Sequence, residues 1–457
     1  PPQREPATSR WSAANLVAMS PEPSDSPPEP RHKPLALVIG LAITLVLLML
    51  VIRAGLQASW RSEGNAVLAE LSAEGLGVDD LFPDPPAKNG APLIRRAYAL
   101  IDPLPEPLMD LPGARPSLLK SALADPTAEG AWTLGNFKTR AELEAGVETI
   151  LAKLEAAEPH LDKGLSREIV YLGDWERGFE ADMPFLMEVK QLVNVLSLRA
   201  SWRSAKGDAP GAYADLERCL RLTLSLRLPQ LITRLVQIAV CLKSLELLED
   251  LLNGGPTPEA SQQARLLTLL SELEQLDGMT PSLRAELQAS SVISDSVPLL
   301  GSEEAPPGAS FLWGYWRKEH FKEMAALIRA SQQPAEEFQA YVAEFEERLP
   351  KEGNVLSKLL MPAIARVVTK NRTCRARLRL AIWGLELAQW DELPAQATGA
   401  PKDPFTLDAK PCGYKREGRG VLLWSVGEDG RDSQGTSADL HGIEGGPDDL
   451  SFRLLRK

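Results

Sequence analysis

The amino-acid sequence predicts a mainly α protein that combines a single N-terminal transmembrane helix, a helical-hairpin bundle and a small C-terminal antiparallel β module. Three observations support this fold class: an uncharged apolar run at 34–52, apolar residues recurring every three to four positions through the centre, and alternation between glycine turns after Pro394. We expect a disordered tail at 1–33, the transmembrane helix at 34–52, a helical domain at 53–393 with a Pro-rich insert at 76–130, and the β module at 394–457.

The apolar run from Pro34 to Ile52 has the length and composition of a membrane anchor. Its nineteen residues, at about 1.5 Å each, extend roughly 28 Å, close to the roughly 30 Å hydrocarbon core of a bilayer. A cleaved secretory signal has a shorter apolar region, of about 7–15 residues, and ends in small residues. Arg53 follows the run directly and no A-x-A site precedes Trp60, so we expect the helix to remain attached.

The charges beside this run do not decide its orientation. Arg31 and Lys33 precede it, while Arg53 and Arg61 follow it, so the positive-inside count is balanced. The preceding tail is short and rich in Pro, Ser and Glu, whereas about 400 residues follow the run. We therefore expect a single-pass protein of the bacterial inner membrane, with the tail inside and the body in the periplasm.

The central region has the pattern of amphipathic helices joined by short connections. Gly207-Asp208, Pro229 and Gly254-Gly255 interrupt the apolar repeat and mark three helix ends. Short connections between consecutive helices favour antiparallel hairpins. The positions expected to be buried are Phe185, Val189, Leu192 and Leu196 in the first helix, Tyr213, Leu216, Leu220 and Leu224 in the second, and Leu231, Leu235, Ile238, Leu242 and Leu245 in the third.

Prolines mark further helix boundaries. Thr257-Pro258 and Thr280-Pro281 each predict an N-cap followed by proline at the first helical position. A long helix is expected from Val355 to Trp390, and Pro362 predicts a kink or an early break in it.

The end of the chain has strand patterns. Residues 414–416 and 421–426 flank the glycine-bearing sequence EGRG, which predicts a β-hairpin. Leu450, Phe452 and Leu454 alternate in a last short strand. These segments together predict a small antiparallel module carried by the preceding helix.

Composition limits the partners. The formal net charge is −12, and an acidic surface repels phosphate backbones, so we expect no nucleic-acid partner. The four cysteines, at 219, 241, 374 and 412, form no CxxC pair and no metal-ligand spacing. They leave open both the compartment and whether any of them pair.

Motifs of known catalytic chemistry are missing from the sequence. The four histidines, at 32, 160, 320 and 441, are scattered, and no HExxH, GxSxG or phosphate-binding glycine loop occurs. Ser117–Lys120 fits S-x-x-K, but it lies in a Pro-rich stretch without the companion motifs. We therefore predict no catalytic residues and no bound organic cofactor.

The C-terminal residues resemble the β segment that ends the major pseudopilins of type II secretion. The similarity comprises the start Asp403-Pro404-Phe405, a strand tyrosine at Tyr414, and a strand end with Ser425, Gly427, Asp429 and Gly430, where Trp424 replaces the usual tyrosine. Unlike pseudopilins, which carry a processed start with a glutamate that directs filament assembly, this chain has no glutamate in 34–52, so we do not expect filament incorporation.

Taken over its whole length, the chain more closely resembles large, uncharacterised, single-pass bacterial membrane proteins that carry such an ending. They share a membrane helix, an NGAPL-like passage, here Asn89–Leu93, and a DWERG-like segment, here Asp174–Gly178. That family has no established activity, so the resemblance implies an architecture more than a function.

The loop after Val426 is the one candidate metal site. Its sequence, GEDGRDSQGTSADL, offers Asp429, Asp432 and Asp439 among glycines. Calcium takes about six to eight oxygen ligands, which a glycine-rich loop can turn toward one point. The resembling pseudopilins bind calcium in this loop, which implies a calcium site here. The alternative is a solvated acidic turn.

Two classes of function remain. The first is a membrane-anchored, non-enzymatic envelope protein whose partners are the lipid bilayer and another protein, bound by the helical domain. The second is an extracytoplasmic enzyme with a site not visible in the sequence, or an accessory component of a secretion or pilus system. The helical hairpins, the anchor and the missing motifs favour the first.

Overall fold

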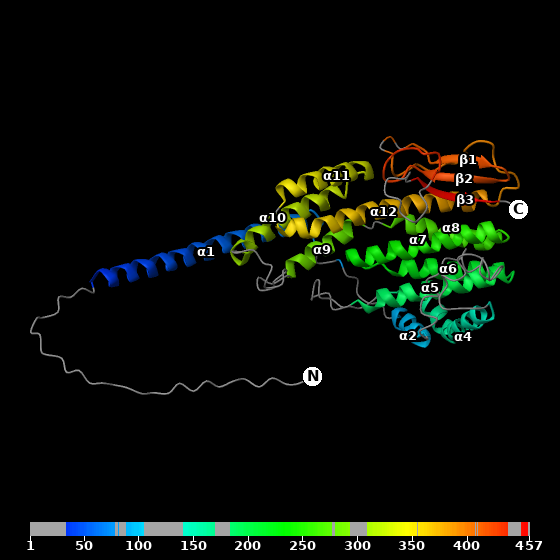
Figure 1. Cartoon of the computed structure of the whole chain (residues 1–457), viewed down its shortest axis with the longest axis horizontal. Coiled ribbons are helices and arrows are strands. Elements are labelled where there is room, and N and C mark those ends of the chain that lie inside the picture. The colour runs from blue at the N-terminus through cyan, green and yellow to red at the C-terminus, as the bar shows by residue number, and fades with distance from the viewer. Residues whose placement is uncertain are drawn as a thin grey trace, which may run out of the picture. The chain divides into compact units, whose positions relative to one another are not determined.

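The computed structural model describes residues 33–77, 81, 88–104, 140–169, 183–276, 279–292, 309–353, 355–406, 408, 410–436 and 449–455. The chain divides into two compact units, residues 1–56 and 57–457. Among the described residues the protein is mainly helical, with one small antiparallel sheet near the C-terminus, as the sequence predicts (Figure 1).

Helix α1 runs from Lys33 to Ala73 and contains the whole predicted anchor run. It is long and apolar enough to cross a membrane, and the apolar side chains from Leu45 to Ile52 are exposed. Within the second unit, the later part of α1 packs on α10, where Trp60 meets Tyr315 edge to face and Glu74 accepts two hydrogen bonds from Arg329. The first unit therefore presents an apolar helical surface with no described protein side chain covering it.

Most of the described residues of the second unit lie in helices (Figure 1). Helix α5 packs against α6, α6 against α7 and α8, and both α7 and α8 against α12, while α2 packs against α4. Their bounds are α2 Ala91–Ile101, α4 Arg140–Leu165, α5 Pro184–Ala205, α6 Ala209–Ser225, α7 Leu231–Gly254, α8 Ala260–Gln275, α9 Thr280–Val292, α10 Ala309–Ala330, α11 Ala335–Glu352 and α12 Val355–Leu387.

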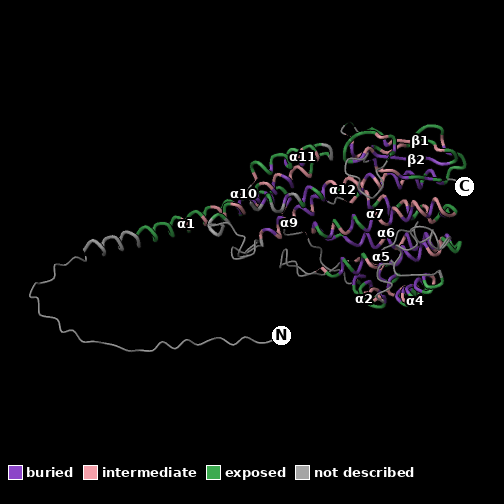
Figure 2. Tube along the Cα trace, viewed as in Figure 1, coloured by how far each residue is buried: buried purple, intermediate pink, exposed green. Residues whose placement is uncertain are grey.

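The apolar repeats face the interior, as Figure 2 shows for α5, α6 and α7. All four predicted positions on α5 and all four on α6 are buried. On α7, Leu231, Ile238 and Leu245 are buried and Leu242 is partly buried, but Leu235 is 37% exposed. Helix α7 carries leucines around its circumference, so sequence spacing alone does not single out its buried face.

One helix start differs from the proline-based predictions, and of the two alternatives predicted at Pro362 the early break is excluded. Helix α8 begins at Ala260 rather than after Thr257, because Gln389 donates a hydrogen bond to the Pro258 carbonyl and the preceding residues stay extended. Helix α9 does begin at Thr280, whose hydroxyl pairs with Ser331 at 2.8 Å. Helix α12 continues through Pro362, so this proline does not end it.

The sheet confirms the predicted hairpin and last strand. Strands β1 (Gly413–Glu417), β2 (Gly420–Ser425) and β3 (Leu450–Leu454) pair antiparallel in that order. Gly418 adopts φ +59 in the β1–β2 turn, a conformation that glycine adopts without strain. Phe452 of β3 lies against Gly384 of α12, where an added Cβ would stand 2.3 Å from the ring, so glycine permits the sheet to pack closely on α12.

Candidate functional site

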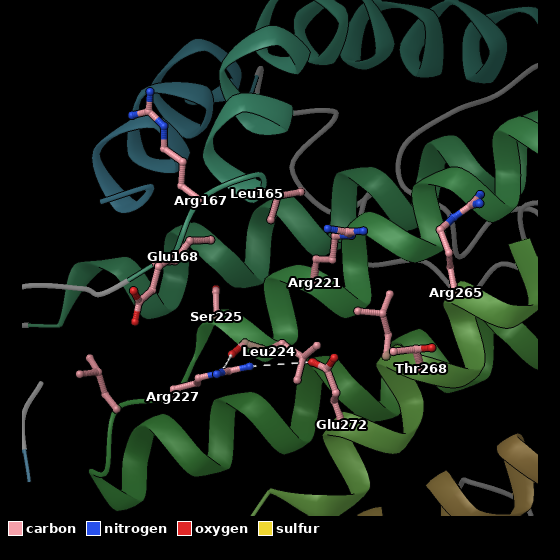
Figure 3. Close-up of a pocket in the computed structure, with 13 residues that line it drawn as sticks. Leu165, Arg167, Glu168, Arg221, Leu224, Ser225, Arg227, Arg265, Thr268 and Glu272 are labelled. Atoms are coloured by element: carbon pink, nitrogen blue, oxygen red, sulfur yellow. Dashed lines mark hydrogen bonds and ion pairs between the residues drawn. The ribbon is translucent and has the colours of Figure 1, made fainter. Parts of the chain in front are cut away.

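A cavity of about 440 Å³ opens beside the C-terminal end of α4, between α6, the α6–α7 connection and α8 (Figure 3). Its walls combine apolar and charged side chains. The apolar lining residues are Leu165, Ile169, Leu224, Leu228 and Leu269, and the charged ones are Arg167, Glu168, Arg221, Arg227, Arg265 and Glu272. Four arginines against two glutamates give this cavity a positive excess on a chain whose net charge is −12.

Two of the arginines are held in place by one carboxylate behind the cavity. Arg221 donates to Glu217 Oε1 from Nε and Nη2 at 3.2 and 2.9 Å, and Arg265 Nε donates to Oε2 at 2.9 Å. Burial raises the pKa of Glu217, but the hydrogen bonds from Arg265 and Arg221 outweigh it and lower the pKa. Glu217 is therefore a fixed anion that orients both guanidinium groups, one on α6 and one on α8.

The other two arginines are less constrained. Arg227 Nε donates to the Leu224 carbonyl at 3.0 Å, and its Nη2 lies 3.9 Å from Glu272 across the cavity. Both side chains are exposed: 61% of the Arg227 side chain and 50% of the Glu272 side chain are accessible to solvent. In Figure 3 the Arg167 side chain extends away from Leu224 and Glu272. Exposed pairs of this kind contribute little to stability, so Arg227 can exchange Glu272 for a ligand anion at small cost.

These side chains suit recognition of an anion attached to an apolar group. Guanidinium groups present forked N–H donors that match carboxylates, and the leucines offer apolar contact beside them. The described lining residues include neither histidine nor cysteine, and the Ser225 hydroxyl donates to the Leu222 carbonyl of its own helix. The cavity thus supplies binding groups rather than a paired nucleophile and base.

A buried ionic cluster joins α4 and α6, which contribute to the cavity, to α5. Asp215 of α6 is fully buried and accepts hydrogen bonds from Arg199, Arg203 and Arg218. The shortest joins Arg199 Nη2 to Asp215 Oδ1 at 2.6 Å. Glu158 of α4 is bonded by Arg199 and Arg218 as well, so the cluster ties α4, α5 and α6 together.

The predicted calcium loop is described in part. Asp429 accepts from the Arg431 N–H, and Asp432 accepts from the Gln434 N–H and from Trp424 Nε1, each at 2.9 Å. Gly427 and Gly430 have positive φ, as expected from their sequence positions. Asp439 lies outside the described residues. Among the residues that are described, no group of three or more potential ligands is arranged to hold a metal ion.

A further carboxylate, that of Asp449, accepts hydrogen bonds from this loop and was not predicted from the sequence. It is 2% exposed and accepts from the Ser433 and Gly435 N–H groups at 3.0 and 2.8 Å. Burial raises its pKa, and the nearby charges of Asp432 and Asp429 raise it further. Asp449 directly precedes β3. Because β3 pairs antiparallel with β2 and the loop follows β2, pairing of these two strands would have placed Asp449 near the loop.

Asp403, at the start of the C-terminal β module, links two parts of that module. Asp403 is 3% exposed and accepts from the Phe405 N–H, the Ser425 hydroxyl and the Val426 N–H at 2.7 to 2.8 Å. The Asp-Pro-aromatic start is thereby joined to the end of β2. Other sequence candidates lie outside the described residues, namely His32, Ser117–Lys120, Asp174–Gly178 and His441.

The arginines that line the cavity were also not predicted from the sequence to form a site. Arg221 lies on α6, Arg227 follows that helix and Arg265 lies on α8, so their convergence depends on how α8 packs against α6, which the local sequence does not show. Comparisons with models of protein families, with curated proteins and with solved structures find no match for this chain.

Proposed function

We propose that this chain is a membrane-anchored, non-enzymatic envelope protein whose helical domain binds another protein through the cavity between α4, α6 and α8. The observation that carries the proposal is the positive excess of that cavity within an acidic chain. A positive site surrounded by negative surface attracts anions to that place and repels them elsewhere.

The favoured ligand is an acidic segment of the partner with an apolar residue beside its carboxylates. Arg227 and the outward donors of Arg221 and Arg265 would bind the carboxylates, while Leu224 and Leu269 would contact the apolar side chain. Glu217 holds two of the guanidinium groups before binding, so little conformational entropy is lost when the ligand arrives.

A direct test uses the full-length chain in detergent and a fluorescent peptide that alternates glutamate and leucine. We expect Arg227→Glu to weaken binding at least tenfold, because it reverses a charge in the cavity without touching the Glu217 pairs. The matched control is Arg419→Glu in the exposed β1–β2 turn, which changes the net charge equally. Equal affinity for the two variants, measured by fluorescence anisotropy, would defeat the proposal.

Residues 34–52 are proposed to span the inner membrane, with the helical domain and the β module in the periplasm. Support comes from the length of α1 and from its exposed apolar surface. Carbonate washing of membranes should leave the chain attached, and protease added to spheroplasts should digest its body. Release by carbonate would refute the anchor, and full protection in intact spheroplasts would reverse the orientation.

One contact favours the enzyme alternative. The Ser290 hydroxyl lies 3.3 Å from His320 Nε2, which is a serine–histidine arrangement, although both residues are buried. A fluorophosphonate probe distinguishes the two functions: labelling that disappears in Ser290→Ala would support a hydrolase, whereas an unlabelled chain that binds the acidic peptide supports the binding protein. A role as an accessory component of a secretion or pilus system is the other alternative and rests on the pseudopilin resemblance.

A further inference from the structure

Two cysteines far apart in the chain come together between α7 and α12. Cys241 of α7 is 2% exposed and Cys374 of α12 is 5% exposed. The two helices pack against each other, and both cysteines line the same small cavity between them. Nearby, Arg234 Nε of α7 donates to Asn371 Oδ1 of α12 at 3.1 Å, which fixes the register of the two helices beside the cysteine pair.

The surroundings of this pair differ from those of the other two cysteines. The hydrogen bond from Cys241 lowers the pKa of Cys374, and the positive charges of Arg234 and Arg375 act in the same direction. In contrast, burial raises the pKa of Cys219 and of Cys412 to about 12 each. Cys219 is also engaged by Ser197, with 3.9 Å between sulfur and oxygen. Thiolate reactivity therefore favours Cys374.

A narrow cavity reaches the two thiols. It has a volume of about 10 Å³, roughly that of one water, and both cysteines line it together with the polar residues Arg234, Glu274 and Asn371. Glu274 and Arg379 form an ion pair at 2.7 Å whose side chains are about one quarter exposed. Cys241 and Cys374 are therefore separated from solvent by side chains at the surface of α8 and α12 rather than by a thick layer of the core.

We propose that Cys241 and Cys374 are a redox-sensitive pair that closes to a disulfide between α7 and α12. The oxidant is a second disulfide, either a small molecule or a thiol oxidoreductase. The Cys374 thiolate attacks one of its sulfurs, and a mixed disulfide forms as the first thiolate leaves. Cys241 then attacks the Cys374 sulfur, and the second thiolate leaves. One S–S bond forms and one breaks, and the two protons and two electrons of the cysteines pass to the oxidant.

The disulfide would link α7, which begins near the cavity between α4, α6 and α8, to α12, which packs against the sheet. Helix α7 follows directly on the cavity residue Leu228, and α12 contacts both β2 and β3. A bond between residues so distant in sequence removes much of the freedom of the unfolded chain. This inference does not depend on the acidic-peptide proposal, because neither cysteine lines the cavity proposed to bind that peptide.

The test begins with the full-length chain, reduced and purified in detergent, and exposed to glutathione disulfide while folded. After acid quenching and denaturation, maleimide labelling counts the free thiols. We expect two of the four thiols to be lost, a peptide map that links Cys241 to Cys374, and a higher melting temperature for the oxidised chain. These measurements on the unaltered protein do not require any variant to fold.

Variants assign the order of attack. Cys241→Ala should stop at a glutathione adduct on Cys374, whereas Cys374→Ala should form neither the adduct nor the disulfide. The controls Cys219→Ala and Cys412→Ala should still lose two thiols. Four free thiols in the folded chain, under conditions that oxidise the urea-unfolded chain, would overturn the proposal, as would a disulfide that includes Cys219 or Cys412.

Discussion

The helical core and the β module each contain a fully buried aspartate, and they satisfy it with different donors. Asp215, between helices, is surrounded by three arginines, whereas Asp403, beside the sheet, is bound by two backbone N–H groups and one hydroxyl. Both are at most 3% exposed. The same side chain is therefore neutralised by full positive charges in one region and by dipoles in the other.

The difference follows from how each kind of backbone uses its hydrogen bonds. In the interior of a helix every N–H group already donates to the carbonyl four residues earlier, so only side chains can reach a carboxylate between helices. Turns and strand ends leave N–H groups unpaired, and a short aspartate can accept from them. The helical region thus uses arginine side chains from three positions, whereas the β module uses backbone N–H groups and one hydroxyl at a turn and a strand end.

The first prediction tests the charged solution. Asp215→Asn removes the carboxylate but keeps its shape, and it leaves Arg199, which is 2% exposed, with Glu158 as its remaining anion. Removing one partner of a buried ion pair costs about 3–5 kcal/mol, and because Glu158 still compensates Arg199 we expect a loss at the lower end of that range. Urea unfolding of the full chain in detergent should show this loss of stability.

A control on the same helix makes that result specific. Asp208 caps α6 by accepting from the Gly211 N–H, and its side chain is 52% exposed. Asparagine is an equally good capping residue, so Asp208→Asn should cost under about 1 kcal/mol. If the two variants lost similar stability, the buried cluster would not be what holds α5 to α6.

A second prediction concerns a buried group that has no charged partner in the described structure and a single hydrogen-bond contact, between its Nε2 and the Ser290 hydroxyl. His320 is 1% exposed, and its Nδ1 has no hydrogen-bond partner among the described residues. Burial lowers its pKa to about 4, so the folded chain resists a proton that the unfolded chain accepts near pH 6.5. The stability present above pH 6.5 is lost as pH falls toward 4, by about 2–3 kcal/mol between pH 7 and 4.5.

His320→Gln removes this titration and keeps a polar side chain at the same place. Its unfolding free energy should therefore fall less than that of the original chain between pH 7 and 4.5. Parallel pH profiles for the two proteins would show that His320 is not buried as a neutral group.

The third prediction tests the dipolar solution. In Asp403→Asn, one oxygen can still accept from Phe405 and Ser425, but the amide NH₂ faces the Val426 N–H. Two donors facing each other leave one unsatisfied, which costs about 2 kcal/mol. Hydrogen exchange should increase at residues 411–426, with little change in α5 and α6. A loss larger than that of Asp215→Asn would reverse the comparison between the two regions.

This contrast also explains what the sequence could predict. The hairpin at 417–420 and the last strand were predictable, because turn glycines and alternation act over a few residues. The buried faces of α5 and α6 followed from spacing. The cavity did not, because Arg227 and Arg265 lie on different elements whose packing is not encoded locally. Asp449 was missed for the same reason: a segment at 437–448, outside the described residues, separates it from Asp432.

The smallest expected effect concerns the predicted calcium site. Asp429, Asp432 and Asp449 lie close enough for their charges to interact, and a cation would relieve that repulsion. Asp432 Oδ1 and both oxygens of Asp449 already accept N–H donors, so a bound ion would use the remaining oxygens and those of Asp439. The site is therefore expected to be weak.

At a tenfold excess of calcium over its dissociation constant, binding would stabilise the folded chain by about 1.4 kcal/mol. We expect a correspondingly small rise in the melting temperature with calcium relative to chelator, and its loss in the double variant Asp429→Asn and Asp432→Asn. Magnesium, which demands a tighter octahedral shell, should stabilise less. Identical melting with calcium and chelator would leave the loop as an acidic turn, and its aspartates would then resemble Asp403, whose oxygens are satisfied by N–H and hydroxyl donors of the protein.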